Sequence, residues 1–77
     1  MYEELRKAIC KGAYQVCLYD DFIVVWVKDR ESRVNIIENA SELDVSESRM
    51  RGSIFIIRIK MPNAKQVMMG VDEDVLC

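Results

Sequence analysis

The run Phe22-Ile23-Val24-Val25-Trp26-Val27 constrains the fold more than any other segment of the chain. Its six residues are all apolar, and most are β-branched or aromatic, which favours extended structure. Because successive side chains of a strand point to opposite faces of a sheet, this run is apolar on both faces. We therefore expect a central strand, with other elements covering each of its two sides.

Two further segments predict strands beside this one. Apolar side chains recur at every second position of residues 53–61, and Pro62 ends the run. The inward positions are Phe55, Ile57, Ile59 and Met61, and the outward positions are Ile54, Ile56, Arg58 and Lys60. Residues 29–32 are typical of a turn, and we expect residues 33–39 to return as a strand nearer an edge of the sheet.

An apolar stripe with i, i+3, i+4 spacing runs along residues 2–11 and predicts an N-terminal helix. We expect Gly12 to end this helix in the left-handed conformation. The same stripe continues to Cys17, so a longer helix is the alternative. Because residues 14–19 are rich in aromatic and β-branched side chains, we favour a strand there, and the choice between helix and strand stays open for residues 13–19.

The remaining segments predict a long connection and a short final helix. Residues 40–52 are polar and serine-rich, which indicates a connection with at most one helical turn. Asn63 can cap a short helix that runs through Met69 and closes at Gly70. Residues 72–77 are expected to fray.

A chain of 77 residues is long enough for one small domain, which buries only about 60–65% of the surface exposed by its unfolded form. We expect residues 1–77 to form a single α+β domain. Its N-terminal helix packs on a three- to four-stranded antiparallel β-sheet, and a short C-terminal helix follows.

The charges of the chain are unevenly distributed. No aspartate or glutamate occurs from Ser48 to Val71, a stretch that we call the acid-free block. Its basic residues are Arg49, Arg51, Arg58, Lys60 and Lys65. The other residues carry six basic and thirteen acidic side chains, so the formal charge of −2 conceals a polarised protein.

Nucleic-acid binding is one function that this polarity suggests. The five basic residues lie on a loop, a strand and a helix start, and together they could follow a phosphate backbone. The order of helix, strands and helix is also similar to that of a double-stranded-RNA-binding domain. That family has a cluster of lysines at the start of its last helix, where this chain has only Lys65. The acidic net charge also opposes non-specific binding, so nucleic-acid binding is the alternative hypothesis.

The composition argues against an enzyme. The chain has no histidine, which removes the commonest general base and the commonest metal ligand. Its three glycines are isolated and form no phosphate-binding loop. Cys10, Cys17 and Cys77 contain no CxxC pair for zinc, and their odd number argues against a closed disulfide framework. Their redox state and roles stay open. We expect no catalytic residue, cofactor, metal site or small-molecule substrate.

The segment Leu18-Tyr19-Asp20-Asp21 is similar to the aromatic-x-Asp-Asp turn of reverse-transcriptase palm hairpins, and paired aspartates can hold magnesium. The similarity covers fewer than ten residues, and a polymerase needs a further carboxylate and a much longer chain. We therefore expect a solvated turn between two strands, at residues 19–22.

Protein interaction is the function that we favour. A basic face beside an acidic remainder is self-complementary, so two copies could dock as a homodimer, or the basic face could bind an acidic protein partner. The candidate interface residues are Trp26, Met50, Met68 and Met69, because tryptophan and methionine are enriched at interfaces. Trp26 would serve as an anchor if it lay on an outer face of the sheet.

The sequence favours a cytoplasmic setting. No stretch approaches the roughly 18–20 apolar residues that span a bilayer, and the acidic N-terminus lacks the layout of a signal peptide. Small accessory proteins of viruses, mobile elements and archaea often have this size and this lack of catalytic residue types. We therefore expect a compact regulatory or interaction module with no membrane association.

Overall fold

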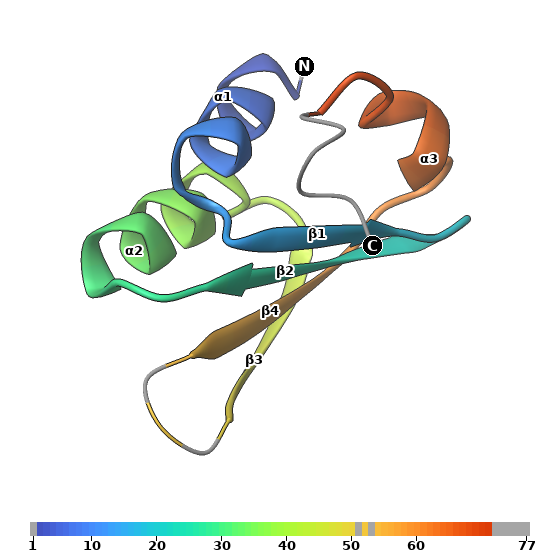
Figure 1. Cartoon of the computed structure of the whole chain (residues 1–77). Coiled ribbons are helices and arrows are strands. Elements are labelled where there is room, and N and C mark those ends of the chain that lie inside the picture. The colour runs from blue at the N-terminus through green and yellow to red at the C-terminus, as the bar shows by residue number, and fades with distance from the viewer. Residues whose placement is uncertain (1, 51, 53, 72–77) are drawn as a thin grey trace.

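The computed structural model describes residues 2–50, 52 and 54–71. In chain order its elements are α1 (Glu3–Gly12), β1 (Gln15–Leu18), β2 (Phe22–Val27), α2 (Arg30–Asn39), β3 (Asp44–Arg49), β4 (Phe55–Lys60) and α3 (Ala64–Val67). The strands form one antiparallel sheet in the order β1-β2-β4-β3, and Figure 1 shows the three helices on the same side of it. The structure is therefore a two-layer α+β arrangement, which confirms the predicted fold class.

Strand β2 has the central position that its apolar run predicts, between β1 and β4. Every second side chain of β2, at Ile23, Val25 and Val27, is fully buried beneath the helices. The alternate side chains point to the other face of the sheet, against which no described helix packs. The described residues therefore supply the expected cover on one side of this strand only, because the three short helices form a single layer.

Strand β4 pairs with β2 along its whole length, with Phe22 opposite Lys60 at one end and Val27 opposite Phe55 at the other. Ile57 and Ile59 are fully buried, as is Met61, which follows the strand. Phe55 packs against the same core, whereas Arg58 and Lys60 are exposed. The predicted inward and outward positions are confirmed.

Helix α1 ends at Gly12 and β1 begins at Gln15, so the shorter of the two predicted helices is correct. Gly12 does not adopt the left-handed conformation that we expected. Its role is steric instead, because a Cβ atom at this position would lie 2.5 Å from Ser32 Oγ on α2. The absence of a side chain allows α1 and α2 to pack closely together.

Residues 30–39 form helix α2, and the prediction of a turn followed by a strand is wrong. The side chain of Asp29 accepts a hydrogen bond of 2.8 Å from the backbone N–H of Ser32, which caps the start of the helix. Ile36 is fully buried, and Ile37 packs against the same core. Val34 is exposed on the outer side of the helix.

Residues 44–49 form the edge strand β3, where the sequence predicted a connection. Asp44 lies opposite Lys60, and Arg49 lies opposite Phe55. Only Val45 is half-buried and the rest of β3 is exposed, so the segment lacks the apolar alternation by which strands are recognised. Pairing with the strongly apolar β4 determines its conformation.

Helix α3 is a single turn, shorter than the predicted helix through Met69. Gly70 has the expected positive φ, at 87°. Asn63 also has a positive φ, at 57°, and its side chain makes no capping hydrogen bond, so the predicted cap is wrong. The fraying expected of residues 72–77 falls outside the described residues.

Candidate protein-binding face

The side of the sheet opposite the helices forms one surface, which we call the open sheet face. The cross-strand register arranges its side chains in three rows across the strands. The first row is Phe22, Lys60 and Asp44, the second is Cys17, Val24, Arg58 and Ser46, and the third is Gln15, Trp26, Ile56 and Ser48. Of these side chains only that of Cys17 is buried.

One half of the open sheet face is apolar. Trp26 lies directly opposite Ile56 on the neighbouring strand, and Val24 lies on the same side of β2. All three side chains are half-buried, and none belongs to the hydrophobic core. Single apolar side chains are ordinary on a protein surface, but adjacent ones that include a tryptophan are typical of binding sites.

The other half of the open sheet face combines aromatic rings with cations. The guanidinium carbon of Arg58 lies 4.1 Å from the ring centroid of Phe22. Tyr19 stacks on the same ring, with the two centroids 4.5 Å apart and the planes inclined by 12°. Tyr19 approaches from the β1 side and Arg58 from the β4 side, so the ring of Phe22 is enclosed between a phenol and a guanidinium.

A shallow recess of about 450 Å³ lies at this end of the sheet. Its lining residues are Asp21, Phe22, Asp44, Ser46, Arg58 and Lys60. Ion pairs in the described part of the chain join Lys7 to Glu4, Arg33 to Glu47 and Lys65 to Asp20. Within that part, neither Arg58 nor Lys60 has a carboxylate at ion-pair distance.

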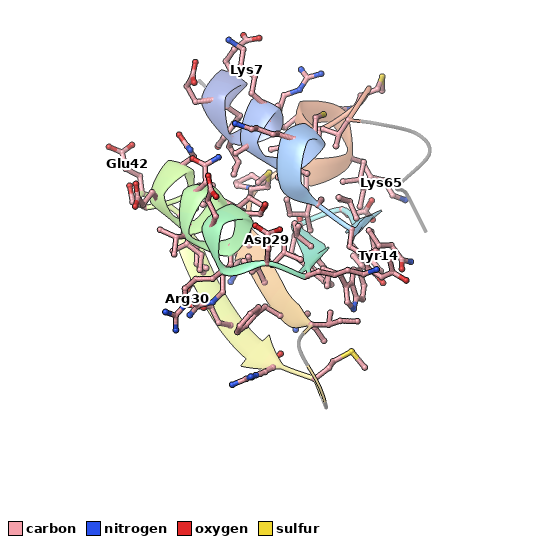
Figure 2. All side chains as sticks on the ribbon, turned by 60° about the vertical axis from the view of Figure 1, so that its left-hand side comes forward. Lys7, Tyr14, Asp29, Arg30, Glu42 and Lys65 are labelled. Carbon is pink, nitrogen blue, oxygen red and sulfur yellow. The ribbon has the colours of Figure 1, made fainter. Side chains whose placement is uncertain are left out.

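The structure does not bring the basic residues of the acid-free block together. Arg58 and Lys60 share the open sheet face. Arg49 points to the helix side, where its guanidinium lies 5.4 Å from the ring centroid of Phe55. Lys65 projects from α3 (Figure 2). Its ammonium group pairs with Asp20 at 3.7 Å. Arg51 lies outside the described residues.

The four candidate interface residues have different surroundings. Trp26 lies on the open sheet face, the location that would make it an anchor. Met50 follows β3 and is 47% exposed, and Met69 follows α3 and is 67% exposed. Met68 is fully buried in the core, so its assignment to an interface is wrong. The helical turn of α3 directs Met68 inward and leaves Met69 in solvent.

The Asp20-Asp21 segment forms the predicted turn between two antiparallel strands. The backbone N–H of Tyr19 donates to the carbonyl of Phe22 at 2.9 Å, which closes the hairpin. Both aspartates are exposed. In the described ranges, no group of three or more Cys, Asp and Glu side chains is placed to hold a metal ion.

Cys10 is a free thiol on the exposed side of α1, and Cys17 is buried in β1. Cys77 lies outside the described residues.

Reasoning from the sequence did not include Phe22, Val24 and Ile56 among the candidate interface residues. A signal was present, because β2 is apolar on both faces and β4 has isoleucines at outward positions. Covering two faces of a sheet requires a helical layer on each, and the sequence offered too few amphipathic segments to supply both.

No protein-family model, curated protein or solved structure matches the chain. None of the helices in the described ranges is long and apolar enough to cross a bilayer. The functional interpretation therefore depends on the chemistry of the open sheet face.

Proposed function

We propose that this chain is a small, non-catalytic interaction module that binds a protein partner through its open sheet face. The proposal retains the cytoplasmic setting expected from the sequence. The observation that carries it is the contiguous apolar strip of Val24, Trp26 and Ile56 beside a cation, Arg58, that has no carboxylate partner among the described residues. Tryptophan and arginine are the residue types most enriched among the energetic centres of protein interfaces.

The chemistry of the face indicates what the partner presents. Apolar side chains would cover Trp26 and Ile56, and carboxylates would meet Arg58 and Lys60 at the shallow recess. Because the ring of Phe22 holds the guanidinium of Arg58 in position, binding a carboxylate there costs less side-chain entropy than binding to a freely moving arginine.

The same geometry favours a protein over a nucleic acid. Single-stranded nucleic acids bind to open sheets by stacking bases on exposed aromatic rings. The ring of Phe22 is already occupied by Tyr19 and Arg58, which leaves Trp26 as the one unoccupied ring on β2. The cations that would follow a phosphate backbone are divided between the two sides of the sheet, as Arg49 and Arg58 show.

A non-catalytic role is supported by the state of the acidic groups in the recess. Asp21 and Asp44 are both exposed to solvent. A carboxylate becomes suited to acid–base chemistry through burial and close charge partners. Neither aspartate is buried.

Site-specific photo-crosslinking in the cells that produce the protein tests this proposal. A photoreactive residue in place of Ile56 on the open sheet face is compared with one in place of Lys7, which projects from the outer side of α1 (Figure 2). We expect a discrete protein adduct from position 56 and none from position 7, and Arg58→Glu should reduce its yield. Equal adducts from both positions, or adducts to nucleic acid alone, would overturn the proposal.

A further inference from the structure

The outer edge of β3 has no partner strand in the described structure. The sheet ends at β3 on one side and at the four-residue β1 on the other, and Figure 1 shows β3 at the margin of the molecule. Strand β3 has six residues, of which only Val45 is half-buried. A strand edge of this length presents a row of unpaired backbone N–H and C=O groups.

The hydrogen bonding of the β3–β4 hairpin shows which backbone groups point outward. The N–H of Met50 donates to the carbonyl of Ile54 at 2.9 Å, so Met50 belongs to a hydrogen-bonded pair with β4. Hydrogen-bonded positions alternate along an antiparallel strand. The even-numbered residues therefore bond to β4, and the backbone groups of Val45, Glu47 and Arg49 are directed away from the sheet.

Three of the devices that protect an exposed edge, namely lysine, proline and a bulge, are missing from β3. Its sequence, Asp-Val-Ser-Glu-Ser-Arg, contains neither lysine nor proline, and its register with β4 continues without a bulge. Its outward-directed backbone positions instead include Glu47 and Arg49, which have opposite charges and lie two residues apart on the same face. A strand with this spacing of charges complements an antiparallel copy of itself.

We propose that β3 is a homodimer interface, at which a second copy of this chain pairs antiparallel in a register centred on Ser48. Glu47 then lies opposite Arg49 of the second copy, and Arg49 lies opposite Glu47 of the second copy. Both pairs occupy positions whose backbone groups point outward, so each exchanges two backbone hydrogen bonds as well as an ion pair. The two four-stranded sheets become one continuous sheet.

The charges of Glu47 and Arg49 favour this register over the neighbouring registers of the same strand pair. In a continuous sheet, each side chain lies opposite a side chain on the same face of the sheet. The register can therefore change only in steps that move the partner of each residue by two positions. Centring on Glu47 places two glutamates opposite each other, which is unfavourable. Centring on Ser46 places Val45 opposite Glu47 and forms no charge pair. Only the register centred on Ser48 pairs Glu47 with Arg49 twice.

The surroundings of Glu47 and Arg49 favour the same arrangement. Arg33 of α2 pairs with Glu47, and the guanidiniums of Arg33 and Arg49 both lie near the ring of Phe55. Among the described residues Glu47 pairs with Arg33 only, so Arg49 has no carboxylate at ion-pair distance. The Nε of Arg33 is buried without a hydrogen-bond partner among the described groups. Pairing across the interface gives Arg49 a carboxylate while Glu47 keeps Arg33.

The homodimer interface is separate from the proposed partner-binding surface. A two-fold axis perpendicular to the sheet leaves both open sheet faces on the same side of the dimer. It also brings Met50, an exposed residue, opposite Ser46 of the second copy. Self-association at β3 can therefore fail while the open sheet face still binds its partner, and the reverse also holds.

Cysteine crosslinking tests the register directly. In the proposed dimer, position 48 faces itself in a non-hydrogen-bonded pair with Cα atoms about 4.5 Å apart, which suits a disulfide. Ser46→Cys is the matched control, because it is an exposed serine on the same strand face, yet its two copies would lie roughly 13 Å apart along the strands. Cys10→Ser, which removes an exposed free thiol, provides the common background.

Under mild oxidation we expect a covalent dimer from Ser48→Cys at a yield at least about tenfold above that from Ser46→Cys. The Cys10→Ser parent has no cysteine in β3 and should form no covalent dimer at this strand. Efficient crosslinking of Ser46→Cys in place of Ser48→Cys would overturn the register, and equal yields from both variants would overturn the proposal as a whole.

A charge exchange tests the ion pairs without a disulfide. Glu47→Arg or Arg49→Glu alone should shift the wild-type dimer toward monomer in sedimentation, because each places like charges opposite each other. The double exchange Glu47→Arg with Arg49→Glu should restore the dimer, and Arg58→Glu on the open sheet face should leave it unchanged. Circular dichroism confirms that each variant is folded. A wild-type protein that stays monomeric at millimolar concentration, or a folded double variant that stays monomeric, would overturn the proposal.

Discussion

The guanidinium of Arg58 lies over the ring of Phe22, with 4.1 Å between its central carbon and the ring centroid. The two residues come from neighbouring strands on the open sheet face, and Tyr19 stacks on the same ring from the β1 side. This arrangement holds a cation beside the apolar strip formed by Trp26 and Ile56 and withdraws one aromatic ring from other contacts.

We predict that the protein does not bind single-stranded RNA or DNA even at low salt. Stacking on aromatic rings contributes about 1–3 kcal/mol per base, and the enclosed ring of Phe22 cannot supply it. Fluorescence anisotropy of labelled oligonucleotides provides the measurement. Binding that weakens steeply with salt and disappears in Arg58→Glu would show that the open sheet face serves a nucleic acid.

Val24 and Val25 form a matched pair for testing the two faces of β2. Val25 is fully buried, so Val25→Ala should lower the free energy of unfolding by about 2–3 kcal/mol through lost burial and a residual cavity. Val24 lies half-buried on the open sheet face, and Val24→Ala should cost less than about 1 kcal/mol. Urea denaturation measures both. Equal losses would mean that both faces of β2 are packed in solution.

Gly12→Ala should destabilise the protein, although alanine favours helices. The added Cβ would lie 2.5 Å from Ser32 Oγ, and overpacking of this kind costs about 1–3 kcal/mol. Ser32→Gly removes the opposing atoms, so the loss caused by Gly12→Ala should be smaller in that background. A double-mutant cycle from thermal unfolding measures the coupling. A more stable Gly12→Ala protein would show that α1 and α2 are further apart than described.

The cap of α2 should make stability depend on pH in the acid range. The hydrogen bond from the backbone of Ser32 lowers the pKa of Asp29 below its ordinary value of 3.8. Because the carboxyl is more acidic in the folded state than in the unfolded state, its stabilising effect is complete above the unfolded pKa and is lost as the pH falls through the folded pKa.

Asp29→Asn is the control, since its amide oxygen can cap the helix but does not titrate. We predict that the Tm of the wild-type protein falls more steeply below about pH 4 than that of this variant. Parallel declines in a circular-dichroism melting series would exclude Asp29 as the titrating cap.

The elements predicted correctly are those whose own side chains specify them. The continuous apolar run of β2 buries one complete face, and the alternation in β4 buries Ile57 and Ile59, which makes both strands recognisable without a partner. The stripe of α1 has the same property, with Leu5, Ala8 and Ile9 buried.

The elements predicted wrongly depend on their surroundings. Strand β3 is almost entirely exposed, and its pairing with β4 determines its conformation. Helix α2 buries only Ile36 among its ten residues, so its pattern is too weak to distinguish it from a strand. Asp29 caps this helix, although aspartate is equally common in turns.

The candidate site was predictable in part. The outward positions of Arg58 and Lys60 followed from the alternation in β4. The absence of a described helix on the opposite face did not follow from the sequence, because it depends on which side of the sheet the helices pack. The position of Arg49 on the helix side follows from the register of β3 with β4, which no local pattern in the sequence specifies.

The central claim is tested most directly by a binding affinity. The partner is the protein captured by the photoreactive residue in place of Ile56, and its affinity is measured for variants of this chain. Trp26→Ala on the open sheet face is compared with Met69→Ala, which removes an exposed apolar side chain from the helix side of the molecule. We predict that Trp26→Ala weakens binding at least about tenfold in titration calorimetry, while Met69→Ala leaves it unchanged. Wild-type affinity for a folded Trp26→Ala protein would contradict the assignment of the open sheet face as the binding surface.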